Sequence, residues 1–170
     1  MAVGELVRSA ELCRQAGLET PIVSCGGSGS YPIAAHIPGV TEIQAGGAIF
    51  SDITYQKWGA KTKNALFVLA SVTSRPTLSR AIVDAGRKCL NAEISMPEVV
   101  DLPGTKLVSL SAEHGVLELD RSARPLRVGE KINFVVGYGD FTIFLHDCLI
   151  GLRNGKVEVV WEILGRGKLT

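Results

Sequence analysis

The pattern that most constrains the fold begins at Leu66, where short apolar runs alternate with turn residues. The runs occupy residues 66–73, 80–84, 106–110, 115–119, 131–136, 142–146, 148–152 and 157–163. Asn154-Gly155 separates the last two runs, and Asn-Gly favours a two-residue hairpin turn. Several short strands at this spacing are typical of an all-β barrel or sandwich. We therefore predict a mainly antiparallel β domain over residues 59–170.

Residues 1–58 follow a different pattern. Apolar residues recur at three- and four-residue spacings over residues 3–16, which predicts a helix that ends at Gly17. Four further elements are predicted: short strands at residues 21–24 and 39–44, a helix start at residues 31–35 and a helix over residues 48–58. This alternation indicates an α/β segment. A complete (β/α)₈ barrel takes about 250 residues, so a chain of 170 residues cannot hold one together with a second domain.

Charge and hydropathy exclude several classes of partner. The chain carries 18 Lys+Arg against 17 Asp+Glu, a formal net charge of +1 without a basic run, so we expect neither nucleic acid nor a membrane surface as a partner. Charges at Glu5, Arg8 and Glu11 interrupt the start of the chain, which therefore lacks the apolar region of a signal peptide. No apolar stretch approaches the roughly 20 residues of a membrane span. We expect a cytoplasmic location.

The cysteines favour a structural role over a chemical one. The four residues form no C-x-x-C pair, the pattern of a zinc knuckle or a dithiol redox site. Free cysteines are commonly buried. We therefore expect buried thiols at Cys13, Cys25, Cys89 and Cys148.

A glycine-rich loop follows the first predicted strand. Its members are Gly26, Gly27, Ser28, Gly29 and Ser30. Backbone N–H groups of such a loop can converge on an anion, and the two serines can add donors. The loop has neither the Lys of a Walker loop nor the G-x-G-x-x-G spacing. From spacing alone, a phosphate cradle and a structural glycine turn both remain open.

Three weaker patterns accompany the loop. Gln44 ends the second predicted strand, a position where polar residues of parallel strands commonly face a ligand. Glu113 and His114 lie in a predicted turn at residues 111–115. They are either ordinary turn residues or a pair whose side chains orient one another for proton transfer. If residues 140–146 are extended, Asp140 and His146 share one face, as a structural pair or as the border of a pocket.

Asp140 and His146 also suggest a metal site. Together with His114, they would give three candidate ligands for a metal-dependent hydrolase. Zinc usually takes at least three protein ligands. This hypothesis needs the three side chains to meet from separate strands.

Read in order, the motifs resemble the D-threonine aldolase and D-serine dehydratase family over nearly the whole chain. They are SCGGSGSY (24–31), PGVTEIQAGG (38–47), FSD (50–52), SRP (74–76), AIVDAGRK (81–88), SAEHG (111–115), VGEK (128–131), LHD (145–147) and WEILGRG (161–167). The resemblance implies a pyridoxal phosphate enzyme of the alanine-racemase-like type. In such an enzyme a (β/α)₈ barrel carries the cofactor and a C-terminal β domain closes the site.

The resemblance also implies roles for residues. The family's glycine loop, matched here by residues 26–30, holds the cofactor phosphate, and Gln44 would contact the cofactor beside it. Tyr138 and Asp140 would border the substrate pocket as candidate catalytic residues. Pyridoxal phosphate would act as the electron sink for retro-aldol cleavage of a D-amino acid or for loss of its β-hydroxyl group.

Two departures from the family pattern concern chemistry. The Schiff-base lysine of the family lies near the start of the barrel, on a strand that this chain does not contain, and no lysine here takes its place. The family's metal motif, a His followed two residues later by Cys or Asp, reads Tyr138-Gly-Asp140 here. Asp140 matches a metal ligand, but a phenol replaces an imidazole poorly, which puts a divalent metal in doubt.

Two functional hypotheses follow. In the first, the chain is the C-terminal portion of a pyridoxal phosphate-dependent lyase for D-amino acids with a β-hydroxyl group: an α/β fragment, the last units of a TIM-type barrel, followed by the β domain, and not active alone. In the second, it is a standalone non-catalytic module that binds a phosphate-bearing ligand or assembles with another chain. Open edges of barrel strands favour pairing, so both predict a homo-oligomer or a complementing barrel half.

Overall fold

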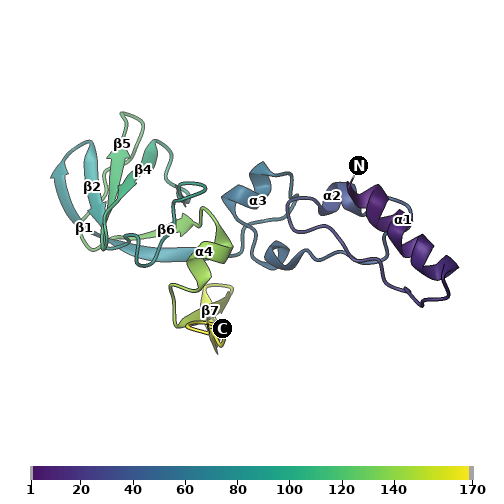
Figure 1. The fold of residues 1–170 in the computed structure, drawn as a ribbon. Helices are drawn as coiled ribbons and strands as arrows, with labels where there is room; N and C mark the ends of the chain where they lie inside the picture. The colour runs from purple at the N-terminus through teal and green to yellow at the C-terminus, as the bar shows by residue number, and fades with distance from the viewer. Residues whose placement is uncertain (1, 169–170) are drawn as a thin grey trace. The chain divides into compact units, whose positions relative to one another are not determined.

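The computed structural model describes residues 2–168, which form two compact units (Figure 1). The N-terminal unit runs to Ser51 and resumes over Tyr55–Ala65. The C-terminal unit comprises Asp52–Thr54 and the chain from Leu66 onward. Asp52–Thr54 therefore lie, in sequence, between the two stretches of the N-terminal unit but belong to the C-terminal unit.

The N-terminal unit contains one long helix and several short ones. The elements are α1 (Ala2–Gln15), α2 (Tyr31–Ala34) and η1 (Gly46–Ile49); α3 (Ile53–Lys57) begins in the C-terminal unit and ends in this one. Gly17 has a φ of +80° just beyond α1, which confirms its predicted role at the helix end. The continuous helix predicted over residues 48–58 is wrong, because Ser51 has a φ of +52°, a conformation that an α-helix cannot contain.

The two strands predicted in this unit are reduced to a single parallel bridge between Ser24 and Glu42. Backbone hydrogen bonds still join the segments: the N–H of Cys25 donates to the carbonyl of Glu42 at 3.0 Å, and that of Gln44 to the carbonyl of Gly26 at 2.8 Å. The pairing is parallel, as in an α/β sheet. A lone parallel pair without neighbours forms few ladder bonds, which explains why no extended strand results.

The C-terminal unit is built on an antiparallel six-stranded sheet. Its strands are β1 (Phe67–Thr77), β2 (Arg80–Val83), β3 (Glu98–Val99), β4 (Thr105–Leu110), β5 (Gly115–Leu119) and β6 (Lys131–Val135). The strand order is β3-β6-β1-β2-β5-β4. The outer strands β3 and β4 also contact each other, so the sheet curls into a nearly closed barrel. This confirms the predicted antiparallel β domain and resolves it as a barrel.

The barrel core follows from the alternation of side chains along the strands. In β1, Val68, Ala70 and Val72 point inward and are buried. The register pairs Val68 with Phe134 and Ala70 with Ile132 of β6, and both partners are buried as well. Inward-facing residues of paired strands thus meet in one apolar interior, which is the main source of the unit's stability.

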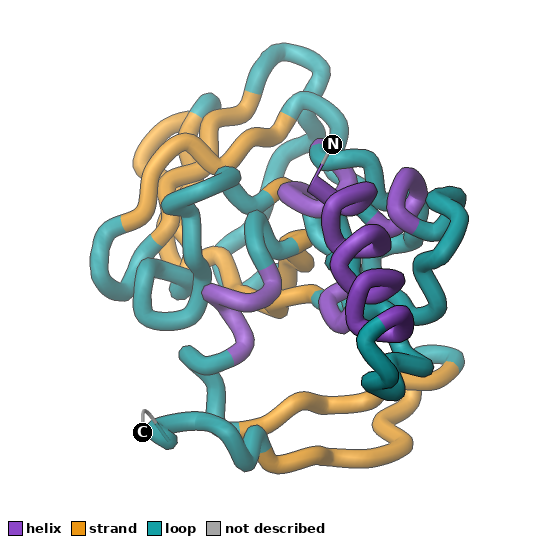
Figure 2. Tube along the Cα trace, turned by 45° about the vertical axis from the view of Figure 1, so that its right-hand side comes forward, coloured by secondary structure: helices purple, strands orange, loops and turns teal. Residues whose placement is uncertain are grey.

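A separate hairpin ends the C-terminal unit. β7 (Cys148–Arg153) and β8 (Lys156–Glu162) pair antiparallel, and Arg153 faces Lys156 across the turn. Asn154 and Gly155 have φ values of +51° and +75°, as a type I′ turn requires. The predicted two-residue hairpin is confirmed, and Figure 2 shows it as two strands joined by a tight turn near the C-terminal end.

One expectation in the C-terminal unit is wrong, and one strand was not predicted. Residues 142–146 were expected to be extended, but they lie in the end of α4 (Gly139–Ile143) and in the turn that follows it. The hydroxyl of Thr142 donates to the carbonyl of Tyr138 at 2.9 Å, a bond that helical geometry provides. Asp140 and His146 therefore do not share one face of a strand. β3 was missed, since two residues are too short to show a period.

We predict that Gly86→Ala destabilises the C-terminal unit by about 1–3 kcal/mol. A Cβ at Gly86 would lie 2.5 Å from backbone atoms of the turn at residues 112–114, which cannot move aside without shifting the turn. Gly165→Ala is the control, since a Cβ there meets nothing within 4 Å. Urea unfolding measures both variants. Equal unfolding midpoints would contradict this packing.

Candidate functional site

The glycine loop closes on itself through short hydrogen bonds. The N–H of Gly27 donates to the hydroxyl of Ser30 at 3.1 Å, and the N–H of Ser30 donates back to the carbonyl of Gly27 at 3.0 Å. Between these residues, the N–H groups of Ser28 and Gly29 donate to no atom within the described part of the chain. The turn thus presents two adjacent backbone donors that residues 2–168 leave unused.

Glycine is required at two loop positions for different reasons. Gly26 has a φ of +86°, and a Cβ there would lie 2.7 Å from the Cβ of Ala34. At Gly29 a Cβ would lie 2.9 Å from the Cβ of Trp58, so the indole side chain packs against the loop backbone. Gly27 is different, because its Cβ would meet nothing within 4 Å. Side chains therefore pack against the loop backbone at Gly26 and Gly29, whereas the loop borders open space at Gly27.

These features fit a phosphate group. Phosphate oxygens accept hydrogen bonds from converging backbone N–H groups and from hydroxyls. The loop supplies the two unused N–H groups and, on the same turn, the hydroxyl-bearing residue Ser28, which is 3% exposed. Open space at Gly27 leaves room for an anion. The residues present thus fit the phosphate of the cofactor that the family resemblance implies.

Gln44 is tied to the loop by both its backbone and its side chain. Its backbone N–H bonds to Gly26, and its side-chain Nε2 donates to the hydroxyl of Ser24 at 2.8 Å. Ser24 in turn donates to Oε1 of Glu42 at 2.5 Å. This chain of polar groups fixes the amide of Gln44 at the carboxyl end of the parallel pair, where a ligand contact was expected.

In the C-terminal unit, Tyr138 and Asp140 flank Gly139 at the start of α4. Tyr138 is the residue before the helix and is extended, with φ −145° and ψ 117°. Its ring packs edge-on against Phe141, with ring centroids 5.0 Å apart. The N–H of Gly139 donates to Oδ2 of Asp52 at 2.7 Å. Sequence analysis did not single out Asp52, although the FSD motif contains it.

The three-ligand metal site is wrong. Across residues 2–168, no three His, Cys, Asp or Glu side chains gather as a metal site would require. His146 places its Nε2 2.9 Å from the carbonyl oxygen of Cys89, which is a structural contact. Glu113 forms an ion pair with Lys88 and raises the pKa of that ammonium group through a hydrogen bond and its charge. We therefore assign residues 111–115 a turn role only.

The cysteines are less buried than expected. Cys13, Cys25 and Cys89 are half-buried, and Cys148 is exposed at the start of β7. The expectation of buried thiols is wrong for Cys148, whose strand belongs to a two-stranded sheet outside the barrel. Burial raises the pKa of the Cys89 thiol.

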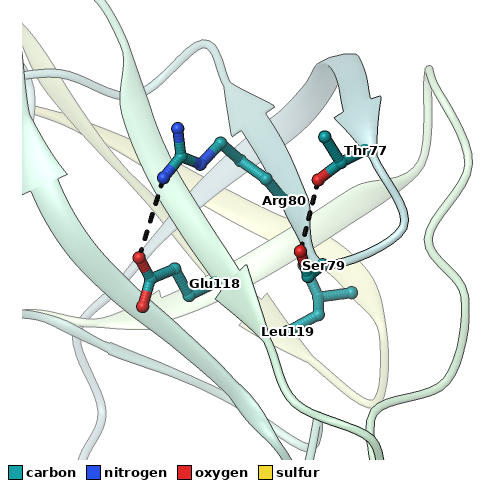
Figure 3. Close-up of a pocket in the computed structure, with 5 residues that line it drawn as sticks. All are labelled: Thr77, Ser79, Arg80, Glu118 and Leu119. Atoms are coloured by element: carbon teal, nitrogen blue, oxygen red, sulfur yellow. Dashed lines mark hydrogen bonds and ion pairs between the residues drawn. The ribbon is translucent and has the colours of Figure 1, made fainter.

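A hollow of about 380 Å³ lies on the barrel at the turn between β1 and β2 (Figure 3). It is lined by Thr77, Ser79, Arg80, Glu118 and Leu119. Its polar groups face each other: Arg80 and Glu118 form an ion pair at 3.8 Å, and the two hydroxyls lie 3.3 Å apart. Because these groups pair among themselves on an open surface, we assign the hollow no role in binding.

Over residues 2–168, no helix combines the length and the apolar character needed to cross a bilayer.

The comparisons with known proteins agree with the fold and the motifs. The chain belongs to the family described as "Putative serine dehydratase domain", whose model matches residues 65–152. A curated D-threonine aldolase from an Arthrobacter species is 37% identical over 162 residues, which cover 93% of this chain and 43% of that protein. The crystal structure of D-threonine aldolase from Filomicrobium marinum is 34% identical with a TM-score of 0.89, over 97% of this chain and 47% of that chain.

A third relative differs in its named reaction. D-threo-3-hydroxyaspartate dehydratase from Delftia sp. HT23 is 27% identical in structure comparison, with a TM-score of 0.82 over 95% of this chain and 49% of that chain. An alanine-racemase-like protein from Idiomarina loihiensis shares the fold, at 22% identity and a TM-score of 0.74. The chain thus spans less than half the length of the relatives it matches. None of them supports a standalone non-catalytic module.

We predict that Cys148 reacts with iodoacetamide several-fold faster than Cys89 at neutral pH. Only the thiolate reacts, and burial both raises the pKa of Cys89 and limits access to it. Peptide mass spectrometry over a time course gives both rates in one sample. Cys148→Ser serves as control and should leave the Cys89 rate unchanged. A Cys89 rate equal to that of Cys148 would contradict the structure.

Proposed function

We propose that the chain is the C-terminal portion of a pyridoxal phosphate-dependent lyase that acts on D-amino acids bearing a β-hydroxyl group. On this proposal residues 1–58 are the α/β segment and residues 59–170 the β domain. The observation that carries the proposal is the glycine loop, whose two unused N–H groups and open space at Gly27 suit a phosphate. The chain alone is not expected to catalyse the reaction.

The names of the relatives support the substrate class. D-threonine and D-threo-3-hydroxyaspartate, which appear in those names, are D-configured amino acids that carry a hydroxyl group at the β carbon. One named reaction cleaves a carbon–carbon bond and the other removes water. We extend only their common part to this chain: a D-amino acid with a β-hydroxyl group as substrate and a lyase reaction.

The roles of this chain's residues follow from their geometry. Backbone N–H groups of Ser28 and Gly29 would hold the phosphate, with the hydroxyls of Ser28 and Ser30 and the backbones of Gly26 and Gly27 completing the loop. Gln44, fixed through Ser24, would contact the cofactor beside it. When bound, pyridoxal phosphate supplies an electron sink for the bond that breaks next to the amino group.

Tyr138 and Asp140 are the residues that we propose for the substrate side. A phenol and a carboxylate can hold or move a proton at a substrate hydroxyl. With Tyr138 in place of an imidazole, the donor set at this position suits a divalent metal poorly. We therefore derive no step through a metal. The lysine that would anchor the cofactor is not assigned to any position of this chain.

An assembly partner completes the proposal. The parallel pair at Ser24 and Glu42 consists of one bridge, and further barrel strands would satisfy its open edges. We propose that a complementing barrel half or a second copy of the chain supplies such contacts.

The phosphate role is tested by the fluorescence of Trp58, which packs against Gly29. The chain has two tryptophans, so Trp161→Phe leaves Trp58 as the reporter. We expect pyridoxal phosphate to quench its emission saturably, inorganic phosphate to compete, and pyridoxal without phosphate to bind at least about tenfold more weakly, a difference of about 1.4 kcal/mol.

The matched variants are Gly27→Ala and Gly46→Ala. A Cβ meets nothing within 4 Å at either position, so both variants should fold. Only the first places a methyl group in the proposed phosphate space, and we expect it to weaken pyridoxal phosphate binding about tenfold or more while Gly46→Ala does not. Equal quenching by pyridoxal and its phosphate, or normal binding by Gly27→Ala, would refute the loop's role.

A further inference from the structure

Asp52–Thr54 are three buried residues inside the C-terminal unit, between two stretches of the N-terminal unit. Asp52 and Thr54 are each 1% exposed and Ile53 is 6% exposed. Burying a carboxylate is costly unless hydrogen bonds compensate for the lost water. The side chain of Asp52 has such a hydrogen bond, because its Oδ2 accepts the N–H of Gly139.

The three residues bind one short backbone segment that continues β6. The N–H of Ile53 donates to the carbonyl of Val136 at 3.3 Å. The carbonyl of Gly137 accepts two hydrogen bonds from Thr54, from its N–H at 3.0 Å and from its hydroxyl at 2.7 Å. Gly139 donates its N–H to Asp52 at 2.7 Å. Val136, Gly137 and Gly139 are thus each hydrogen-bonded to one residue of Asp52–Thr54.

The fixed segment carries the two residues proposed for the substrate side. Gly139 stands between Tyr138 and Asp140, so the hydrogen bond to Asp52 sets the backbone from which both side chains project. Gly139 also gives Asp52 room, since a Cβ there would lie 3.2 Å from Oδ2. On the other side, Thr142 bonds to the carbonyl of Tyr138. The segment is therefore held at both ends.

We propose that Asp52 is a positioning residue: its buried carboxylate orients Tyr138 and Asp140 by holding the N–H of Gly139. The inference rests on the proposed function, because it takes these two side chains as the substrate-facing pair. Asp52 itself touches neither substrate nor cofactor in this proposal. The side-chain oxygen at position 52 is the feature that the role requires, because it accepts the N–H of Gly139.

The positioning role is tested on the full chain labelled with 3-fluorotyrosine. The chain has three tyrosines, so its ¹⁹F spectrum should contain three signals, and Tyr138→Phe assigns that of Tyr138. In Asp52→Ala we expect the Tyr138 signal to shift or broaden while those of Tyr31 and Tyr55 stay. Asp52→Asn retains an oxygen that can accept from Gly139 and should restore the Tyr138 signal.

The control variant is Asp84→Ala. Oδ1 of Asp84 also accepts a backbone N–H, from Ser71 at 2.6 Å, and neither residue belongs to the segment that Asp52–Thr54 bind. Its removal should leave the Tyr138 signal in place. If Asp52→Ala unfolds, Asp52→Asn decides: a native Tyr138 signal supports the proposal. An unfolded Asp52→Asn, or one whose Tyr138 signal is displaced, overturns it.

A titration with D-threonine separates this inference from the proposed function. In the unmodified chain loaded with pyridoxal phosphate, D-threonine should shift the Tyr138 signal, and Asp52→Ala should reduce that shift several-fold. No shift in the unmodified chain would count against the proposed function, while the ligand-free spectra still test the positioning role. An equal shift in Asp52→Ala would overturn the positioning role alone.

Discussion

The pairing of β6 is the constraint on which the C-terminal unit depends. Residues 131–135 pair with β1 on one side, and the end of the strand pairs with β3 on the other. The backbone beyond the strand then bonds to Asp52–Thr54 instead of to another strand. The apolar side chains of β6 face the barrel interior, so the register cannot slip without exposing Phe134. Tyr138 and Asp140 lie a few residues beyond this strand, so its pairing also holds their backbone in place.

The N-terminal unit depends on a different constraint, the close packing around its glycine loop. Trp58 and Ala34 approach the backbone at Gly29 and Gly26, which leaves no room for a larger side chain at either position. Such packing suits a structural glycine turn and a phosphate cradle equally, and these are the two interpretations that spacing alone left open. The observation that supports the phosphate cradle in our proposal is the pair of unused N–H groups at Ser28 and Gly29.

Strong local signals in the sequence predicted most of the fold. The Asn154-Gly155 hairpin and the alternating strands of the barrel could be predicted because turn chemistry and period act locally. A strand was wrongly predicted at residues 142–146, since an apolar run this short fits a helix as well as a strand. Asp52 could not be predicted as a site residue, because its partner Gly139 lies 87 residues away. Only the FSD motif marked its position.

The central claim is that this chain holds the phosphate of pyridoxal phosphate without anchoring the cofactor covalently. It is tested most directly by mixing the purified chain with one equivalent of pyridoxal phosphate, reducing with borohydride and mapping the peptides by mass spectrometry. We predict that the cofactor is bound before reduction but lost on dilution, and that no single lysine carries the reduced adduct. Stoichiometric modification of one lysine would contradict it, since the chain would then contain its own anchor.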